Sequence, residues 1–127
     1  MPLLRKAPKA RVINVSSLAH MMGSINFENI HLRNGVYDQI KAYSQSKLAN
    51  ILFTRELAKR LGEKSSVTVY SLHPGSIMTE IARHGPLKEL RYWFMHYICL
   101  TPEMGRQTTL YCALDDSLDN KSGFYYS

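Results

Sequence analysis

The residue pair with the clearest chemical potential is Tyr43 and Lys47, which stand four positions apart in the run Tyr-Ser-Gln-Ser-Lys. In a helix this spacing puts both side chains on one face. A free phenol has a pKa of about 10 and transfers protons poorly at neutral pH, but a neighbouring ammonium stabilises the phenolate. Such a pair could serve as a general acid or base. Tyr37 and Lys41 have the same separation, so the spacing alone does not identify a site.

Hydroxyl groups and a tight turn follow the two segments that we expect to be buried strands. Residues 11–16 are rich in β-branched side chains and lead into Ser17, and residues 67–73 form a similar run that ends at Pro74 and Gly75. The carboxyl ends of parallel strands meet at one edge of a sheet, where open α/β folds bind ligands. We therefore expect both strand ends to lie at the same edge as the tyrosine–lysine pair.

The longest expected element is a helix over residues 39–61, which contains no Gly or Pro and ends with basic residues followed by Gly62. At about 100° per residue, its apolar side chains occupy two sides. Leu48, Ile51, Leu52 and Ala58 face one way, while Phe53 and Leu57 face nearly the opposite way. We expect one side to pack on a sheet and the other on a second helix or on a partner subunit.

The remaining segments complete an alternation of strands and helices. They are the end of a helix at 1–10, a loop at 24–38 closed by Asn34 and Gly35, short helical pieces at 77–100, a helix at 101–114 and a strand at 124–126. This order predicts an α/β fold built on a parallel sheet.

Composition narrows the classes of protein that fit. The chain has 127 residues, 45% of them hydrophobic and 20% charged, which is typical of one folded domain. No apolar run approaches the roughly 20 residues needed to cross a bilayer. Cys99 and Cys112 show no metal-ligand spacing and suit a reduced intracellular protein, so no metal site is expected. The basic residues behind the net charge of +6 are dispersed, which argues against a nucleic-acid partner.

Three segments, in the right order, resemble the short-chain dehydrogenase/reductase family. They are Asn14-Val15-Ser16-Ser17, Tyr43-Ser44-Gln45-Ser46-Lys47 and Pro74-Gly75-Ser76-Ile77-Met78-Thr79. The sequences of residues 11–20 and 46–61 resemble the retinol dehydrogenase branch of that family more closely still. The resemblance extends from about residue 11 to residue 126, and it implies a doubly wound, Rossmann-type parallel sheet with flanking helices.

The resemblance also implies a role for each matched residue. Tyr43 would be the general acid/base, Lys47 would lower its pKa and bind the nicotinamide ribose, and Ser17, rather than Ser16, would hold the substrate oxygen. The cofactor would be NADP(H), with NAD(H) as the alternative, and the substrate a retinoid or another lipophilic alcohol or aldehyde. The segment that lies along the nicotinamide would comprise Pro74, Gly75, Ile77 and Thr79.

The Gly-rich turn that begins this fold is not found among the seven glycines of the chain. We therefore expect residues 1–127 to be the C-terminal, catalytic part of one domain, without its N-terminal strands. Such a fragment is expected to bind NADP(H) poorly and to have little activity. The alternative is a truncated, non-catalytic isoform that joins a full-length homologue; the helix over residues 39–61 could also join copies of this chain.

Membrane contact is left open by the sequence. Residues 87–100 carry several large apolar side chains, which could cover a lipophilic substrate, touch a membrane or pack on the core. Members of the resembling branch are commonly tethered by an N-terminal segment, so for a full-length parent an endoplasmic reticulum or other organelle membrane is expected.

Overall fold

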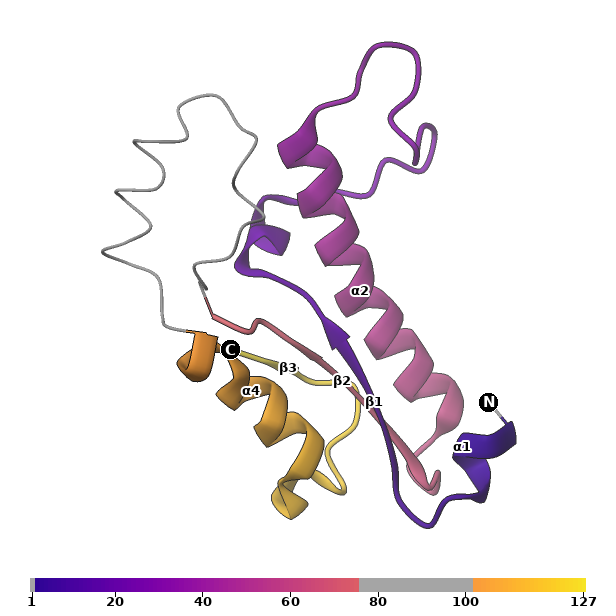
Figure 1. The fold of residues 1–127 in the computed structure, drawn as a ribbon. Coiled ribbons are helices and arrows are strands. Elements are labelled where there is room, and N and C mark those ends of the chain that lie inside the picture. Colours follow the sequence, from indigo (N-terminus) through magenta and orange to yellow (C-terminus); the bar gives the residue numbers. More distant parts are fainter. Residues whose placement is uncertain (1, 76–101) are drawn as a thin grey trace.

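The computed structural model describes residues 2–75 and 102–127, and it contains one parallel three-stranded sheet (Figure 1). The strands are β1 (Ala10–Val15), β2 (Val67–Leu72) and β3 (Tyr125–Tyr126), in the order β1-β2-β3. The predicted α/β class and the parallel sheet are confirmed. Ile77, Thr79 and the segment 87–100 lie outside the described residues.

Helices flank this sheet on both faces (Figure 1). They are α1 (Pro2–Lys6), α2 (Gln39–Leu61) and α4 (Pro102–Leu114), with two short 3₁₀ helices, η1 (Leu18–Met22) and η3 (Asp116–Leu118). The prediction of α2 is confirmed at both ends, whereas η1 and η3 were not predicted, because a single 3₁₀ turn is too short to produce a hydrophobic period. No helix in the described ranges is long and apolar enough to cross a membrane.

Local hydrogen bonds determine where α2 begins and ends. The Asp38 carboxylate accepts a hydrogen bond from the Lys41 backbone N–H at 2.7 Å, which caps the first turn. At the other end, Gly62 adopts φ = 75° and donates its N–H to the Ala58 carbonyl at 3.1 Å. Glycine enters this left-handed region at little cost, which explains why the helix stops there.

A cluster of buried side chains lies between the sheet and α4. Tyr70, Leu72, Cys112 and Leu118 are fully buried there, and Tyr126 packs against them. The Tyr70 hydroxyl donates to the Leu118 carbonyl at 2.6 Å, so the one polar atom of that side chain is satisfied inside the core.

The opposite face of the sheet receives α2, but its sheet-facing side differs from the prediction. Ile51 is buried as expected, whereas Leu52 is 45% exposed and does not share its side. One helical step turns the side chain by about 100°, so Leu52 points along the outer surface with Phe53, which is 56% exposed. Thr54 is buried and takes part of the sheet-facing side in place of an apolar residue.

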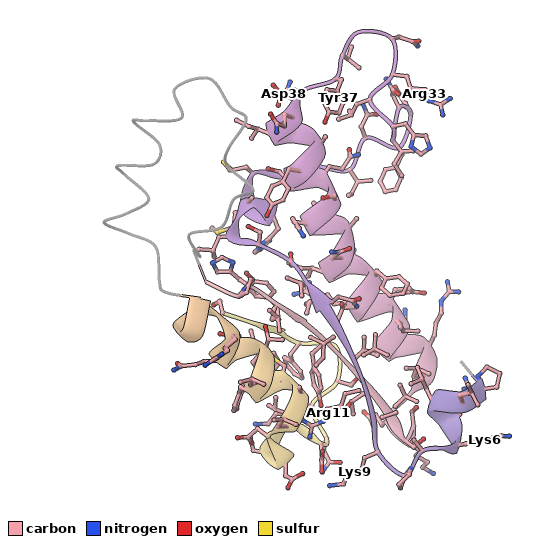
Figure 2. All side chains as sticks on the ribbon, viewed as in Figure 1. Lys6, Lys9, Arg11, Arg33, Tyr37 and Asp38 are labelled. Carbon is pink, nitrogen blue, oxygen red and sulfur yellow. The ribbon has the colours of Figure 1, made fainter. Side chains whose placement is uncertain are left out.

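An ion-pair network joins the start of β1 to η3, near the end of α4 (Figure 2). The Asp119 carboxylate binds the Lys9 ammonium and, at 2.6 Å, the Arg11 guanidinium. Arg11 also donates to the carbonyls of Cys112 and Asp115. Lys9, and then Arg11, hold the pKa of Asp119 below its ordinary value.

This network predicts a specific acid sensitivity. Because the pKa of Asp119 is lower in the folded state, its contribution to stability is present at neutral pH and is lost as the pH falls through that folded value. We expect the unfolding temperature of the wild type to drop between about pH 5 and pH 3, and Asp119→Asn to show a smaller drop from a lower starting value.

The matched control is Asp116→Asn, since the Asp116 carboxylate is 86% exposed and pairs with Lys9 at 3.4 Å. Its curve should follow that of the wild type. Parallel curves for Asp119→Asn and wild type across the whole pH range would contradict the role given to Asp119.

Candidate active site

The strands end together at one edge of the sheet. Val15 pairs with Leu72, and Leu72 pairs with Tyr126, so the three carboxyl ends are in register. The chain leaves β1 into Ser17 and leaves β2 into the turn at Pro74. The structure thus brings these two sequence-predicted segments to the same edge, as expected for a parallel sheet.

Side chains of α2 hold the end of β1 directly. The carbonyl oxygen of Val15 accepts one hydrogen bond from the Asn50 amide at 3.0 Å and another from the Lys47 ammonium at 3.3 Å. In the reverse direction, the Ser16 hydroxyl donates to the Lys47 carbonyl at 2.7 Å. Lys47 therefore contacts the Ser-bearing strand through both its side chain and its backbone.

A second set of contacts lies one and two turns further along α2. The Asn14 amide donates to the Thr54 hydroxyl at 2.8 Å, and that hydroxyl donates to the Asn50 carbonyl, also at 2.8 Å. Thr54 is fully buried, so both functions of its hydroxyl are used away from water. We refer to these contacts together as the β1–α2 polar seam, which comprises Asn14, Val15, Ser16, Lys47, Asn50 and Thr54.

The roles of Asn14 and Thr54 in this seam were not predicted from the sequence. A usable signal was present, since Lys47, Asn50 and Thr54 recur at helical spacing on the side of α2 that also carries Ile51. Polar residues repeated on a sheet-facing side indicate that they bond to the strand beneath, because buried polar groups need partners.

The two tyrosine–lysine pairs differ sharply in the structure. The Lys47 ammonium lies over the ring of Tyr43, 5.4 Å from its centroid, and Tyr43 remains 45% exposed. Tyr37 instead precedes the first residue of α2 and is 67% exposed (Figure 2). The pair of Tyr37 and Lys41 thus does not share a helix face, which resolves the ambiguity that the spacing left.

The two adjacent serines are also distinguished. Ser16 is 2% exposed and its hydroxyl is used in the seam. Ser17 is half-buried and caps η1, where its oxygen accepts a hydrogen bond from the Ala19 N–H at 3.2 Å. A hydroxyl can accept and donate at once, so this bond leaves the Ser17 proton available to a ligand oxygen.

Close packing presses η1 against α2. Gly23 ends η1, and a Cβ built at this position would lie 2.5 Å from the carbonyl oxygen of Ser44. No side chain can be accommodated at that distance without movement of the backbone. The absence of a side chain at Gly23 therefore sets the distance between the turn that carries Ser17 and the first turns of α2, where Tyr43 lies.

The turn after β2 is described as far as Gly75. Pro74 and Gly75 are half-buried, and Gly75 adopts φ = 85°. A backbone without a Cβ in this conformation can be approached closely by a flat ligand. Within the described ranges, no group of three His, Cys, Asp or Glu residues is placed to hold a metal ion.

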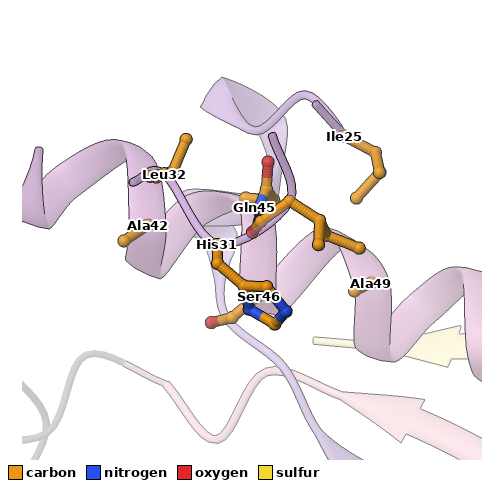
Figure 3. Close-up of a pocket in the computed structure, with 8 residues that line it drawn as sticks. Ile25, His31, Leu32, Ala42, Gln45, Ser46 and Ala49 are labelled. Atoms are coloured by element: carbon orange, nitrogen blue, oxygen red, sulfur yellow. Dashed lines mark hydrogen bonds between the residues drawn. The ribbon is translucent and has the colours of Figure 1, made fainter. Parts of the chain in front are cut away.

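A cavity of about 270 Å³ lies elsewhere, between α2 and the loop over residues 25–32 (Figure 3). Its lining consists of Ile25, Ile30, His31, Leu32, Ala42, Gln45, Ser46 and Ala49. The Gln45 amide holds the loop, since it accepts from the Asn26 N–H and donates to the Ile30 carbonyl, both at 2.9 Å. The helix residues of this lining form a stripe of α2 beside the one that carries the polar seam, and none of them belongs to the seam.

The packing at Gly23 leads to a testable prediction. Gly23→Ala should lower the free energy of unfolding by about 1–3 kcal/mol, because the methyl group overlaps a backbone oxygen. Amide hydrogen exchange should also become faster in residues 18–22. Both effects can be measured by chemical unfolding and by exchange mass spectrometry.

Gly35→Ala provides the control, since a Cβ there meets no described atom within 4 Å and only the positive φ of 78° is unfavourable. It should cost about 1 kcal/mol and leave exchange in η1 unchanged. Unchanged exchange in the Gly23 variant would show that the close contact does not order this turn.

Comparison with known protein families gives a match over residues 1–89 to the model described as short chain dehydrogenase. Among curated proteins, the chain is 44% identical to human (Homo sapiens) retinol dehydrogenase 11 over 124 residues, which are 98% of this chain and 38% of that protein. Human retinol dehydrogenase 12 is also 44% identical, over 98% of this chain and 39% of its own length. The chain thus spans less than two fifths of these relatives.

Solved structures agree with the fold. The crystal structure of an uncharacterised protein from Mycobacterium paratuberculosis is 35% identical, with a TM-score of 0.65, and the match covers 92% of this chain and 37% of that one. NADPH-bound carbonyl reductase from chicken fatty liver is 23% identical, with a TM-score of 0.63, over 98% of this chain and 46% of its own. At that identity, the second likeness concerns the fold alone.

Proposed function

The chain belongs to the short-chain dehydrogenase family, and on this premise we propose that it carries the catalytic part of an NADP(H)-dependent, retinol dehydrogenase-like oxidoreductase. The reaction would interconvert a lipophilic, retinoid-like alcohol and its aldehyde. The observation that carries the proposal is the position of Lys47, whose ammonium lies over Tyr43 while also binding the strand that leads into Ser17. In this proposal, residues 1–127 form part of one domain rather than the whole of it.

Tyr43 is proposed as the group that transfers the proton. Its ring is 45% exposed and is therefore accessible to a substrate oxygen. A phenol hydroxyl can pass a proton to or from a substrate oxygen that lies within hydrogen-bond distance. An ammonium carries three N–H donors, and one of those of Lys47 is directed to the Val15 carbonyl. The others are proposed to bind a cofactor ribose.

Ser17 is proposed to bind the substrate oxygen. Its oxygen accepts from the Ala19 N–H, a bond that does not use the hydroxyl proton, and we propose that this proton points at a carbonyl or alcohol oxygen. A donor held in place before the reaction stabilises negative charge that develops on that oxygen. Ser16, with its proton committed to the Lys47 carbonyl, is a structural residue in this proposal.

We propose that the residues that follow β2 bind a nicotinamide. Pro74 and Gly75 follow β2 in a turn whose positive φ exposes the backbone, and we propose that Ile77 and Thr79 continue this contact. A bound nicotinamide would supply or accept the hydride, which none of the side chains at this edge can do. NADP(H) is preferred over NAD(H) on the sequence resemblance alone.

The surroundings of Ser17 support a lipophilic substrate. Leu18, Met21 and Met22 follow it in η1 and are 48%, 77% and 71% exposed. Exposed apolar side chains next to a polar group suit a molecule with an apolar body and one oxygen, and methionine adapts readily to different shapes. The curated relatives bear the name retinol dehydrogenase, in agreement with this class.

The proposal predicts that removal of the Tyr43 hydroxyl oxygen strongly lowers the rate of catalysis. Tyr43→Phe should lower kcat/KM for NADPH-dependent retinal reduction by about 10²–10⁴-fold, because the general acid is lost. The assay would use the chain alone and a version completed with the portion of human retinol dehydrogenase 11 that lies outside the matched segment.

Tyr37→Phe is the matched control, because it removes the same atom from the other tyrosine–lysine pair. It should leave turnover unchanged. Equal rates for wild type and Tyr43→Phe in the completed enzyme would remove Tyr43 from its proposed role.

A second candidate function, a module that joins other chains through α2, is supported by the outer surface of that helix. Leu52 and Phe53 are both about half exposed there, so the helix presents two neighbouring large apolar side chains to a partner. The partner would be a full-length homologue or a second copy of this chain.

Size-exclusion chromatography tests this second function. If it holds, the chain should elute with full-length human retinol dehydrogenase 11 or as a dimer, and Phe53→Gln should weaken the association at least tenfold. Phe27→Gln is the control, because Phe27 is 84% exposed but lies outside α2. A monomer that does not bind the relative would exclude the module.

A further inference from the structure

We propose that His20 is a positioning residue, which fixes the turn that carries Ser17 through the Nδ1–H tautomer of its imidazole. The inference depends on the proposed function only for the role given to Ser17. The geometry of the turn stands independently of it.

The imidazole of His20 is bound to the serine itself. Nδ1 of His20 lies 2.7 Å from the carbonyl oxygen of Ser17, which also accepts the backbone N–H of His20 at 3.0 Å. A carbonyl oxygen can only accept, so Nδ1 must carry the proton. In a neutral imidazole, Nε2 is then the unprotonated nitrogen. One residue thus supplies two donors to a single oxygen of Ser17.

A second element fixes the orientation of the ring. The His20 ring meets the ring of Tyr125 edge to face, with centroids 5.0 Å apart and planes at 63°. Tyr125 belongs to β3 and pairs with Ser71 in β2. Because the strand order is β1-β2-β3, this contact ties the turn that follows β1 to the strand two positions away.

His73 lies at the end of β2, the strand between β1 and β3. It follows β2, donates its backbone N–H to Tyr126 at 2.8 Å and precedes Pro74. Burial, together with the nearby His20, lowers the pKa of His73. His20 is therefore close to both turns that the proposed function places around the reacting groups.

The link from the imidazole to the Ser17 hydroxyl runs through one turn of backbone. The Ser17 hydroxyl is oriented by the Ala19 N–H, and the Ser17 carbonyl belongs to the peptide that begins this turn. Without the Nδ1 bond, that peptide would be held by one donor instead of two. The position of the Ala19 N–H, and with it the direction of the hydroxyl, would then be less restricted.

Three substitutions at His20 separate this role from simple packing. In Asn, the amide nitrogen is separated from Cβ by the same number of bonds as Nδ1 in His, whereas the amide nitrogen of Gln corresponds to Nε2. His20→Asn should therefore restore the bond to Ser17, and His20→Gln should not. His20→Phe retains a ring against Tyr125 without any N–H. His31→Gln is the control, since His31 is exposed in the loop before α2.

The experiment uses the 127-residue chain. Long-range ¹H–¹⁵N spectra of the wild type should show His20 protonated at Nδ1, with the signal assigned by its loss in His20→Gln. Amide exchange in residues 18–22 should become about five- to tenfold faster in His20→Gln and His20→Phe, as expected for the loss of one hydrogen bond. His20→Asn and His31→Gln should exchange as the wild type does.

A neutral His20 ring in the wild type that is protonated at Nε2 and not at Nδ1 would overturn the inference, as would equal exchange rates in the Asn and Gln variants. If a variant fails to fold, the tautomer measured on the wild type still decides. None of these readouts involves turnover, so a failure of the proposed role of Tyr43 would leave them unaffected. Conversely, Tyr43-dependent turnover with no effect of His20→Gln on exchange would reject this inference and keep the function.

Discussion

The arrangement of this protein depends on how the end of β1 is held once it leaves the sheet. The backbone carbonyl of Val15, at the end of the strand, accepts hydrogen bonds from two side chains of α2, Lys47 and Asn50. Ser16 returns a hydrogen bond to the backbone of the same helix. The strand end and the helix consequently cannot shift independently, and the residues that follow each of them keep a fixed relation.

Lys47 therefore both holds the end of β1 and lies beside Tyr43. Its bond to Val15 limits the positions that its ammonium can adopt, and the ammonium then lies over Tyr43. A flexible lysine loses much conformational entropy when it is ordered, so a prior structural contact reduces what a ligand must still order. The same logic applies to Ser17, whose oxygen is held by the Ala19 N–H in a bond that does not use the hydroxyl proton.

The two sides of α2 serve different purposes. The side on the sheet carries the polar seam, in which Thr54 is fully buried and hydrogen-bonded in both directions. The outer side carries the loop held by Gln45 and, beyond it, the exposed Phe53. A change on the outer side can therefore alter association while leaving the contacts around Tyr43 in place, which allows the two candidate functions to be tested separately.

The sequence by itself determined the α/β class, the bounds of α2 and the resemblance of three short segments to one family, because periodicity, caps and short motifs are local properties. The spacing alone did not distinguish Tyr43 from Tyr37, and the choice of Tyr43 depended on the family resemblance. The tertiary structure separates the two pairs directly, by starting α2 after Tyr37 and placing Lys47 over Tyr43. Likewise, the seam with Asn14 and the contact at Gly23 join residues far apart in the chain. Such contacts depend on distances in three dimensions, which no local pattern records.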